Sequence, residues 1–142
     1  MITAHGSERR YQVTYSSKDQ EAIDDAGKEN GGGGAGFRPH ELLEAALGTC
    51  MAITIRMYAD RKQIPLENVT VHVEVDHPGG ESVFRYDVQL SGESLTEEQR
   101  ARLMKIARSC PVHKTLAGPI RFEDTSSVGT VPPPDASASL TY

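Results

Sequence analysis

Cysteine is scarce in this sequence, and positive charge is not in excess. Only Cys50 and Cys110 occur among 142 residues, and the formal net charge at pH 7 is −5. A negatively charged protein has little attraction for a phosphate backbone, so we expect no nucleic-acid partner. The first fifteen residues lack the apolar segment of a secretory signal, and the longest uncharged, mainly apolar stretch, residues 45–55, is too short to span a membrane. We therefore expect a cytoplasmic protein with one core and no membrane partner.

The two cysteines stand in different sequence settings. Cys50 lies inside an apolar segment, whereas Cys110 directly precedes Pro111. Proline suits the first turn of a helix, which places Cys110 near a helix N-terminus, where the dipole favours a thiolate. Cytoplasmic thiols rest reduced, so a bond between these two would be transient. The pattern predicts a buried Cys50 and a more mobile Cys110 that cycle between dithiol and disulfide; the alternative is two inert core cysteines.

The N-terminal part of the chain predicts short strands and a loop. Residues 9–16 alternate in polarity and residues 21–26 form a weaker extended segment, which together indicate a hairpin-like start. Residues 27–36, with the run GGGGAG, predict a flexible loop. No Lys-Ser or Lys-Thr pair follows this run, so it does not indicate a phosphate-binding loop, and we expect no cofactor.

A long apolar helix is predicted over residues 39–62. Pro39 suits its first turn, and Glu41 and Glu44 lie near the positive end of its dipole. Apolar residues cover nearly its whole circumference, which is typical of a helix surrounded by other structure. A single chain of this size has few elements with which to surround it, so we expect a homodimer. The predicted fold class is α+β, with this helix buried at the centre.

The remaining elements follow from periodicity and capping. Alternation with period two predicts strands, and Thr96 with Gln99 forms a capping-box pattern at the start of a helix. The predicted elements are strands over 68–75 and 82–90 joined by a turn at 77–80, helices over 96–109 and 112–117, and a last strand over 120–123. Residues 125–142 contain three consecutive prolines and predict a tail, which leaves 1–124 as the domain.

Two segments carry a resemblance to a known family. RPHELLEAALGTCMAITIRMYADRK, residues 38–62, and ARLMKIARSCPVHKTL, residues 101–116, resemble the two cysteine motifs of the OsmC/Ohr family, the osmotically inducible and organic-hydroperoxide-resistance proteins. The residues of the two motifs are most similar to those of the short OsmC-like branch of the family. The resemblance covers roughly residues 8 to 124. It implies an α+β fold in which a curved antiparallel sheet from two chains wraps the central helices of an intertwined homodimer.

The resemblance also implies an activity. Cys50 matches the peroxidatic cysteine, whose thiolate attacks a hydroperoxide and becomes a sulfenic acid. Cys110 matches the resolving cysteine, which closes a disulfide that an external dithiol reductant then opens. Organic hydroperoxides are the family's characteristic substrates, with hydrogen peroxide reduced less well. In the Ohr branch the reductants are lipoylated proteins, which we do not assume for this chain.

Two departures from the family pattern concern activation of the thiolate. Ohr members carry a glutamate directly after the proline of the first motif, where this chain has His40, and the nearest acid is Glu41. They also use an arginine from the N-terminal hairpin, for which Arg9, Arg10 and Arg38 are the candidates here. Glu41 and Cys50 are nine residues apart, so on one helix they lie on opposite sides and about 13 Å apart along it. Glu41 would act through a bridging arginine or from the partner subunit, or it simply stabilises the helix N-terminus.

Other readings of the sequence remain open. Cys110 and His113 have the spacing of half a zinc site, but a structural site needs four ligands, so we expect no metal. His5, His40 and His77 have no partner at ligand spacing. Besides a peroxidase, the chain could be a binding module for a hydrophobic or thiol-reactive small molecule without efficient turnover, or an interaction protein whose cysteines are only core residues.

Overall fold

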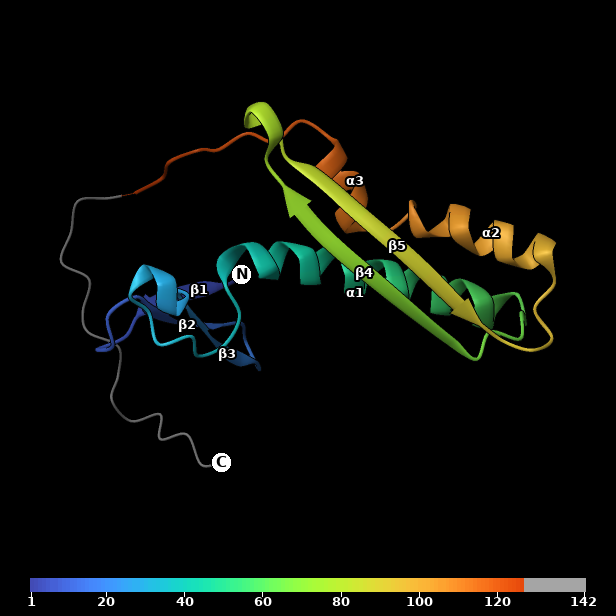
Figure 1. Ribbon diagram of the computed structural model, residues 1–142, viewed down its shortest axis with the longest axis horizontal. Helices are drawn as coiled ribbons and strands as arrows, with labels where there is room; N and C mark the ends of the chain where they lie inside the picture. The colour runs from blue at the N-terminus through green and yellow to red at the C-terminus, as the bar shows by residue number, and fades with distance from the viewer. Residues whose placement is uncertain (127–142) are drawn as a thin grey trace. The chain divides into compact units, whose positions relative to one another are not determined.

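The computed structural model describes residues 1–126 and divides the chain into two compact units. The first unit contains residues 1–37 together with the segment from Arg121 onward, and the second contains residues 38–120. Of the predicted tail, residues 127–142 lie outside the described residues. The elements, labelled in Figure 1, are β1 (Thr3–Gly6), β2 (Gln12–Ser16), β3 (Glu21–Asp25), η1 (Lys28–Asn30), α1 (Pro39–Arg61), β4 (Asn68–Asp76), η2 (Pro78–Gly80), β5 (Val83–Ser91), α2 (Glu97–Ala107) and α3 (Pro111–Ala117).

The first unit is a three-stranded antiparallel sheet with the order β1-β2-β3. The predicted hairpin corresponds to β2 and β3, while the exposed strand β1 was not predicted. Asp25, at the end of β3, organises the glycine-rich loop, because its Oδ2 accepts hydrogen bonds from the backbone N–H groups of Gly33 and Ala35, both at 3.1 Å. The predicted strand over 120–123 is wrong, since these residues form no regular element.

The second unit is built on a long β4–β5 ribbon that lies along α1 (Figure 1). The two strands pair antiparallel from Asn68 opposite Ser91 to Asp76 opposite Val83. Burial alternates strictly along β4, so its valines face the helices and its polar side chains face solvent. At the turn, Gly79 and Gly80 adopt φ values of 62° and 87°, which favour glycine. The predicted hairpin is therefore confirmed.

The helices cover the apolar face of the ribbon. The capping box at Thr96 is confirmed, because its hydroxyl accepts a hydrogen bond from the Gln99 N–H at 3.2 Å and the Gln99 side chain accepts one from the Thr96 N–H at 3.0 Å. The first core cluster joins α1, α2 and the ribbon through Ile55, Ala59, Leu66, Val88, Leu95, Leu103 and Ala107. The second cluster contains Leu47, Met51 and Cys110, with Cys50 packed against it. The predicted α+β class is confirmed.

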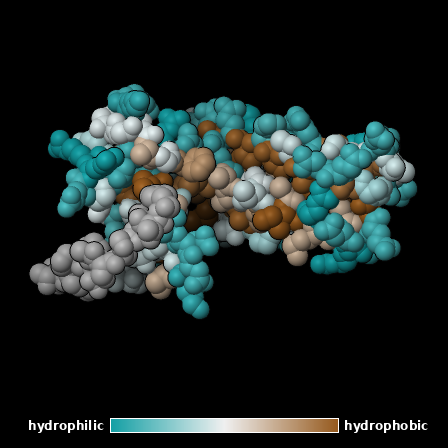
Figure 2. Space-filling view, turned by 90° about the horizontal axis from the view of Figure 1, so that it is seen from below, coloured by the Kyte–Doolittle hydropathy of each residue, from teal (hydrophilic) through white to brown (hydrophobic). Residues whose placement is uncertain are grey.

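Within this chain, α1 is covered along one face only. Its buried residues are Leu47, Gly48, Met51, Ile55 and Ala59, which recur at helical spacing. The opposite face exposes three large apolar side chains, Leu43, Ile53 and Met57, by 44%, 59% and 57%. Figure 2 shows apolar side chains grouped together at the surface, with hydrophilic side chains on both sides of them. The single chain thus does not bury α1 on every side.

The length and composition of α1 would also allow it to cross a membrane. Residues 45–55 are only the uncharged part of α1, which has 23 residues as a whole. Core helices of soluble proteins meet the same criterion, so this is weak evidence for a membrane span.

Candidate thiol site

The structure brings the two cysteines together although they are 60 residues apart in sequence. Cys50 lies on α1, and Cys110 is the N-cap residue of α3, which packs on α1. Both are free thiols, and the Cys50 side chain interacts with that of Cys110. The position of Cys110 at the start of a helix, predicted from Pro111, is confirmed.

The burial of the two cysteines is the reverse of the prediction. Cys110 is fully buried, whereas Cys50 is half-buried. The prediction was wrong because an apolar circumference on α1 does not tell which side of the helix its own chain covers. The proline break places Cys110 under the sheet, against Leu47 and Met51, rather than at a mobile surface.

Burial also decides the electrostatics of Cys110. Loss of solvent raises the pKa of the Cys110 thiol. The His113 N–H donates a hydrogen bond to Sγ at 3.2 Å and lowers this pKa, whereas the neighbouring Cys50 raises it further. The predicted stabilisation of a thiolate by the helix N-terminus is therefore outweighed by desolvation. Cys110 remains a protonated thiol at neutral pH.

Glu41 is engaged at the N-terminus of α1. Its Oε2 accepts a hydrogen bond from the Arg38 N–H at 2.8 Å, and its Oε1 lies 2.9 Å from the Arg38 guanidinium. The backbone N–H of Arg38 and then its side chain lower the pKa of this carboxyl. This geometry is that of a helix cap. The nine residues of continuous helix between Glu41 and Cys50 keep the two apart within one chain.

The three candidate arginines occupy different places. Arg38 pairs with Glu41, as described above. Arg9 and Arg10 belong to the first unit, where the Arg10 guanidinium lies 5.4 Å from the centre of the Tyr11 ring. Arg9 and Arg10 thus lie outside the unit that carries the two cysteines, and Arg38 is engaged at the N-terminus of α1.

Two hollows flank the thiol pair, and the sequence analysis identified neither. The first, the Tyr86 pocket, has a volume of about 130 Å³ and is lined by Leu47, Phe84, Tyr86, His113, Leu116 and Ala117. His113 packs edge-to-face on Tyr86, with ring centres 6.1 Å apart. The second, the α1–α2 groove, has a volume of about 290 Å³ and is lined by Thr54, Met57, Tyr58, Arg61, Ile106 and Ser109.

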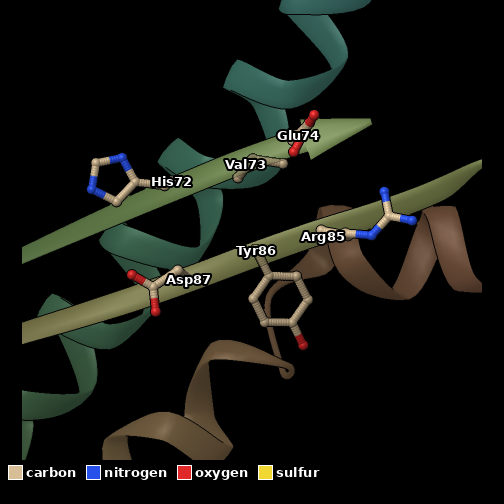
Figure 3. Close-up of a pocket in the computed structure, with 6 residues that line it drawn as sticks. All are labelled: His72, Val73, Glu74, Arg85, Tyr86 and Asp87. Carbon is tan, nitrogen blue, oxygen red and sulfur yellow. The ribbon is translucent and has the colours of Figure 1, made fainter. Parts of the chain in front are cut away.

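A third hollow lies on the β4–β5 ribbon. Figure 3 shows His72, Glu74, Arg85 and Asp87 projecting from the two strands, while the Tyr86 ring turns toward the helical segment. Across the strands, His72 is opposite Asp87, and Glu74 is opposite Arg85, whose charge has the opposite sign. His72 is exposed, as its place in the alternation predicts. This surface is an ordinary solvated sheet face.

The histidines form one contact that sequence spacing could not reveal. The rings of His40 and His77, which come from α1 and the ribbon turn, have centres 5.2 Å apart. Sequence reasoning left both without a partner, because the contact depends on how the turn folds back onto α1. Within residues 1–126, no group of three or more His, Cys, Asp or Glu side chains could hold a metal ion.

Comparison with known proteins now decides the family. The family model described as OsmC-like protein matches residues 31–124, which include both cysteines. The chain belongs to the OsmC-like family. The resemblance seen in the two cysteine motifs is thereby confirmed. No curated protein sequence matches the chain.

Solved structures of OsmC-like proteins share this fold. An OsmC-like protein from Mycoplasma pneumoniae is 22% identical, with a TM-score of 0.69, and the match covers 83% of this chain and 86% of that one. An organic hydroperoxide resistance protein OsmC from Legionella pneumophila is 25% identical, with a TM-score of 0.56 and coverage of 83% and 88%. An organic hydroperoxide resistance protein from Vibrio cholerae, with captopril bound in one of its active sites, is 26% identical, with a TM-score of 0.54 and coverage of 83% and 85%.

Proposed function

We propose that this OsmC-like protein is a thiol-dependent peroxidase that reduces organic hydroperoxides, and hydrogen peroxide less well. The observation that carries the proposal is the pairing of two free thiols from distant parts of the chain, one half-buried and one fully buried. The hydroperoxide-resistance names of the Legionella and Vibrio relatives support the substrate class.

The two environments divide the work between the cysteines. The Cys50 thiolate attacks one oxygen of ROOH, the O–O bond breaks, and the alcohol ROH leaves with a proton, so Cys50 becomes a sulfenic acid. Cys110 then attacks that sulfur, water leaves, and a disulfide forms. An external dithiol reductant takes the disulfide and restores both thiols. Half-exposure of Cys50 gives the peroxide access, and the raised pKa of Cys110 keeps it a thiol until the sulfenic acid is formed.

Glu41 enters the proposal as a group that acts from a second subunit. The Arg38–Glu41 ion pair is already formed, at 2.9 Å, and is partly exposed. Because α1 holds it away from Cys50 of its own chain, the pair would have to reach Cys50 of a partner copy. There, an arginine held by a carboxylate would stabilise the thiolate.

A homodimer is the partner arrangement that we propose. The exposed apolar side chains of α1, Leu43, Ile53 and Met57, lie on the helix that carries Cys50, and a second copy of α1 is a natural cover for them. In an Ile53→Glu variant, we expect light scattering to report a monomer. The matched control is Thr70→Glu on the solvated face of β4, which should leave the dimer intact. A wild-type protein that is monomeric at micromolar concentration would contradict this arrangement.

The activity itself is tested by peroxide consumption. Purified protein with dithiothreitol should reduce cumene hydroperoxide faster than hydrogen peroxide, and one equivalent of peroxide should produce an intramolecular Cys50–Cys110 disulfide detectable by mass spectrometry. Two free thiols after peroxide treatment would contradict the peroxidase. The second candidate, a binding module without efficient turnover, is favoured by two observations: Glu41 caps its own helix, and His40 packs on His77. It predicts that Cys50 reacts with a thiol-reactive label but that the protein does not consume peroxide catalytically.

For the location of the protein, we keep the cytoplasm as our proposal.

A further inference from the structure

The imidazole rings of His40 and His77 meet at one end of the β4–β5 ribbon. Their centres are 5.2 Å apart, their planes are inclined by 72°, and both residues are exposed. His40 lies in the first turn of α1, and His77 lies between β4 and η2, so both belong to the second unit. Neutral imidazole is a common ligand of Zn²⁺, Ni²⁺ and Cu²⁺, which makes this contact a candidate metal site.

The separation of the two rings matches that of two imidazoles on one tetrahedral ion. With a metal–nitrogen bond of about 2.0–2.1 Å, each ring centre lies about 3.2 Å from the ion, and two such rings at the tetrahedral angle have centres about 5.2 Å apart. The observed separation is 5.2 Å. The fold therefore holds the two rings at the distance that a shared ion requires.

Hydrogen bonds around the pair fix the ribbon turn. The Glu44 carboxylate accepts a hydrogen bond from the Val75 N–H at 2.8 Å, which joins α1 to the end of β4. Asp76 Oδ1 accepts one from the His77 N–H at 2.8 Å. Ser82 Oγ lies 3.3 Å from His77 Nδ1. In the tautomer with the proton on Nδ1, the ring donates to Ser82 and its Nε2 is left to bind a metal, which is how ligating histidines are usually oriented.

The surrounding charges permit a bound cation. Each histidine is next in sequence to a carboxylate that is already paired, in the Arg38–Glu41 and Arg85–Asp76 ion pairs at 2.9 and 3.3 Å. The positive end of the α1 dipole opposes a cation, but Glu41 and Glu44 in the first turns of the helix counter it.

The pair lies on the side of α1 that faces the ribbon. His40 precedes the buried residues Leu47 and Met51 by seven and eleven positions, which is the spacing of one helix face. Ile53, which we propose for the dimer contact, is about 140° away from His40 around the helix. That contact is therefore on another side of α1. Cys50 lies about 15 Å further along the helix, too far to be a ligand within the same chain.

We propose that His40 and His77 together bind one divalent transition-metal ion, of the class of Zn²⁺, Ni²⁺ and Cu²⁺, which links the start of α1 to the β4–β5 turn. Residues 1–126 offer no group of three or more His, Cys, Asp or Glu side chains for an ion, so the protein supplies two ligands and water the others. The ion is therefore exchangeable rather than permanently held. The site is separate from the thiol pair and does not depend on the peroxidase proposal.

The first test is a calorimetric titration of Ni²⁺ into reduced protein that carries no affinity tag. His40→Ala and His77→Ala should each bind the ion at least about tenfold more weakly than the wild type, because each removes one of the two protein ligands. His72→Ala, on the solvated face of β4, is the matched control and should bind as the wild type does. Ser82→Ala should cause a smaller loss, since Ser82 only orients His77. Equal affinity of the wild type and either His40→Ala or His77→Ala would overturn the proposal.

The second test removes the thiols, which are competing ligands for these ions. The double variant Cys50→Ser/Cys110→Ser should keep the site and lose it when His77→Ala is added. Cu²⁺ bound to the double variant should show two nitrogen ligands by electron paramagnetic resonance. Binding that disappears with the thiols, or a spectrum without nitrogen ligands, would overturn the histidine site.

The third test uses the metal dependence of the thermal midpoint in proteins that keep both cysteines. Ni²⁺ should raise the midpoint of the wild type, because an ion that binds only the folded state stabilises it, and chelation by EDTA should reverse the rise. His40→Gln and His77→Gln, which retain a polar side chain at each position, should show no rise. An equal rise in the wild type and in both glutamine variants would also overturn the proposal.

Discussion

The two faces of α1 have similar compositions and different surroundings. Met51 and Ile55 are fully buried against the ribbon and the other helices, whereas Ile53 and Met57 expose more than half of their surface. The same residue types therefore serve as core on one face and as surface on the other. Cys50 is half-buried and stands where the two faces meet, which gives its sulfur a buried neighbour and an open approach. Reactivity on this helix is set by what covers each face, not by residue type.

The sharpest test of this comparison exchanges each thiol for a hydroxyl. Cys50→Ser should abolish peroxide consumption, because the nucleophile at the open side is lost. Cys110→Ser should keep a single turnover, because the sulfenic acid still forms but cannot be resolved inside the protein. Stopped-flow consumption of cumene hydroperoxide at one equivalent distinguishes the two. Full multiple turnover in Cys50→Ser would reverse the assignment.

The next test uses the same residue type on both faces. Ile55→Ala should lower the free energy of unfolding by about 2–5 kcal/mol, because it leaves a cavity in the first core cluster. Ile53→Ala, two residues away on the exposed face, should cost less than about 1 kcal/mol in the monomer. Urea unfolding, at a protein concentration too low for the dimer to form, compares the free energies of unfolding of the two variants. Similar losses for both variants would mean that the exposed face is covered within the chain.

The pH dependence of the free energy of unfolding tests the burial of Cys110. The pKa of Cys110 is raised by burial, so its neutral thiol favours the folded state. That contribution is complete below the pKa of the thiol in the unfolded chain and is lost as the pH rises through the higher folded value. Reduced wild-type protein should therefore lose more stability between pH 8 and pH 10 than Cys110→Ser does, measured by urea unfolding with a reductant present. An equal loss in both proteins would contradict the desolvated thiol.

The smallest expected effect concerns Glu41 at the helix N-terminus. Its pKa is lowered by Arg38, so its contribution is present above the ordinary carboxyl pKa and is lost as the pH falls through the lower folded value. Glu41→Gln should lower the thermal midpoint slightly at pH 7 and make no difference at strongly acidic pH. Circular dichroism melts at both pH values are sufficient. Glu44→Gln is unsuitable as a control, because the Glu44 carboxylate accepts a hydrogen bond from the Val75 N–H at 2.8 Å.

Local patterns predicted most of the elements of the second unit. Alternation gave β4 and β5 to within a residue at each end, and the Thr96 capping box and Pro111 placed the starts of α2 and α3. These signals act over a few residues. The short strand β1, which is exposed throughout, has no alternation to reveal it, and the strand expected over 120–123 lacks a partner strand in the described residues.

The site was predictable only in its residue types. The two motifs identified Cys50 and Cys110, but not which would be buried, since that depends on where α3 packs. The contact of His40 with His77 and the two hollows beside the thiols also depend on tertiary packing.

Gly48, two residues before Cys50, limits how this protein can vary. A β-carbon at this position would lie 3.2 Å from Val73 Cγ2, so the backbone of α1 approaches β4 directly there. A larger side chain at this position would therefore require Val73 or the helix to shift by a few tenths of an ångström. For protein engineering, position 48 is therefore a spacer whose size sets how closely α1 packs on the ribbon, and it should be kept fixed when the pockets around it are redesigned.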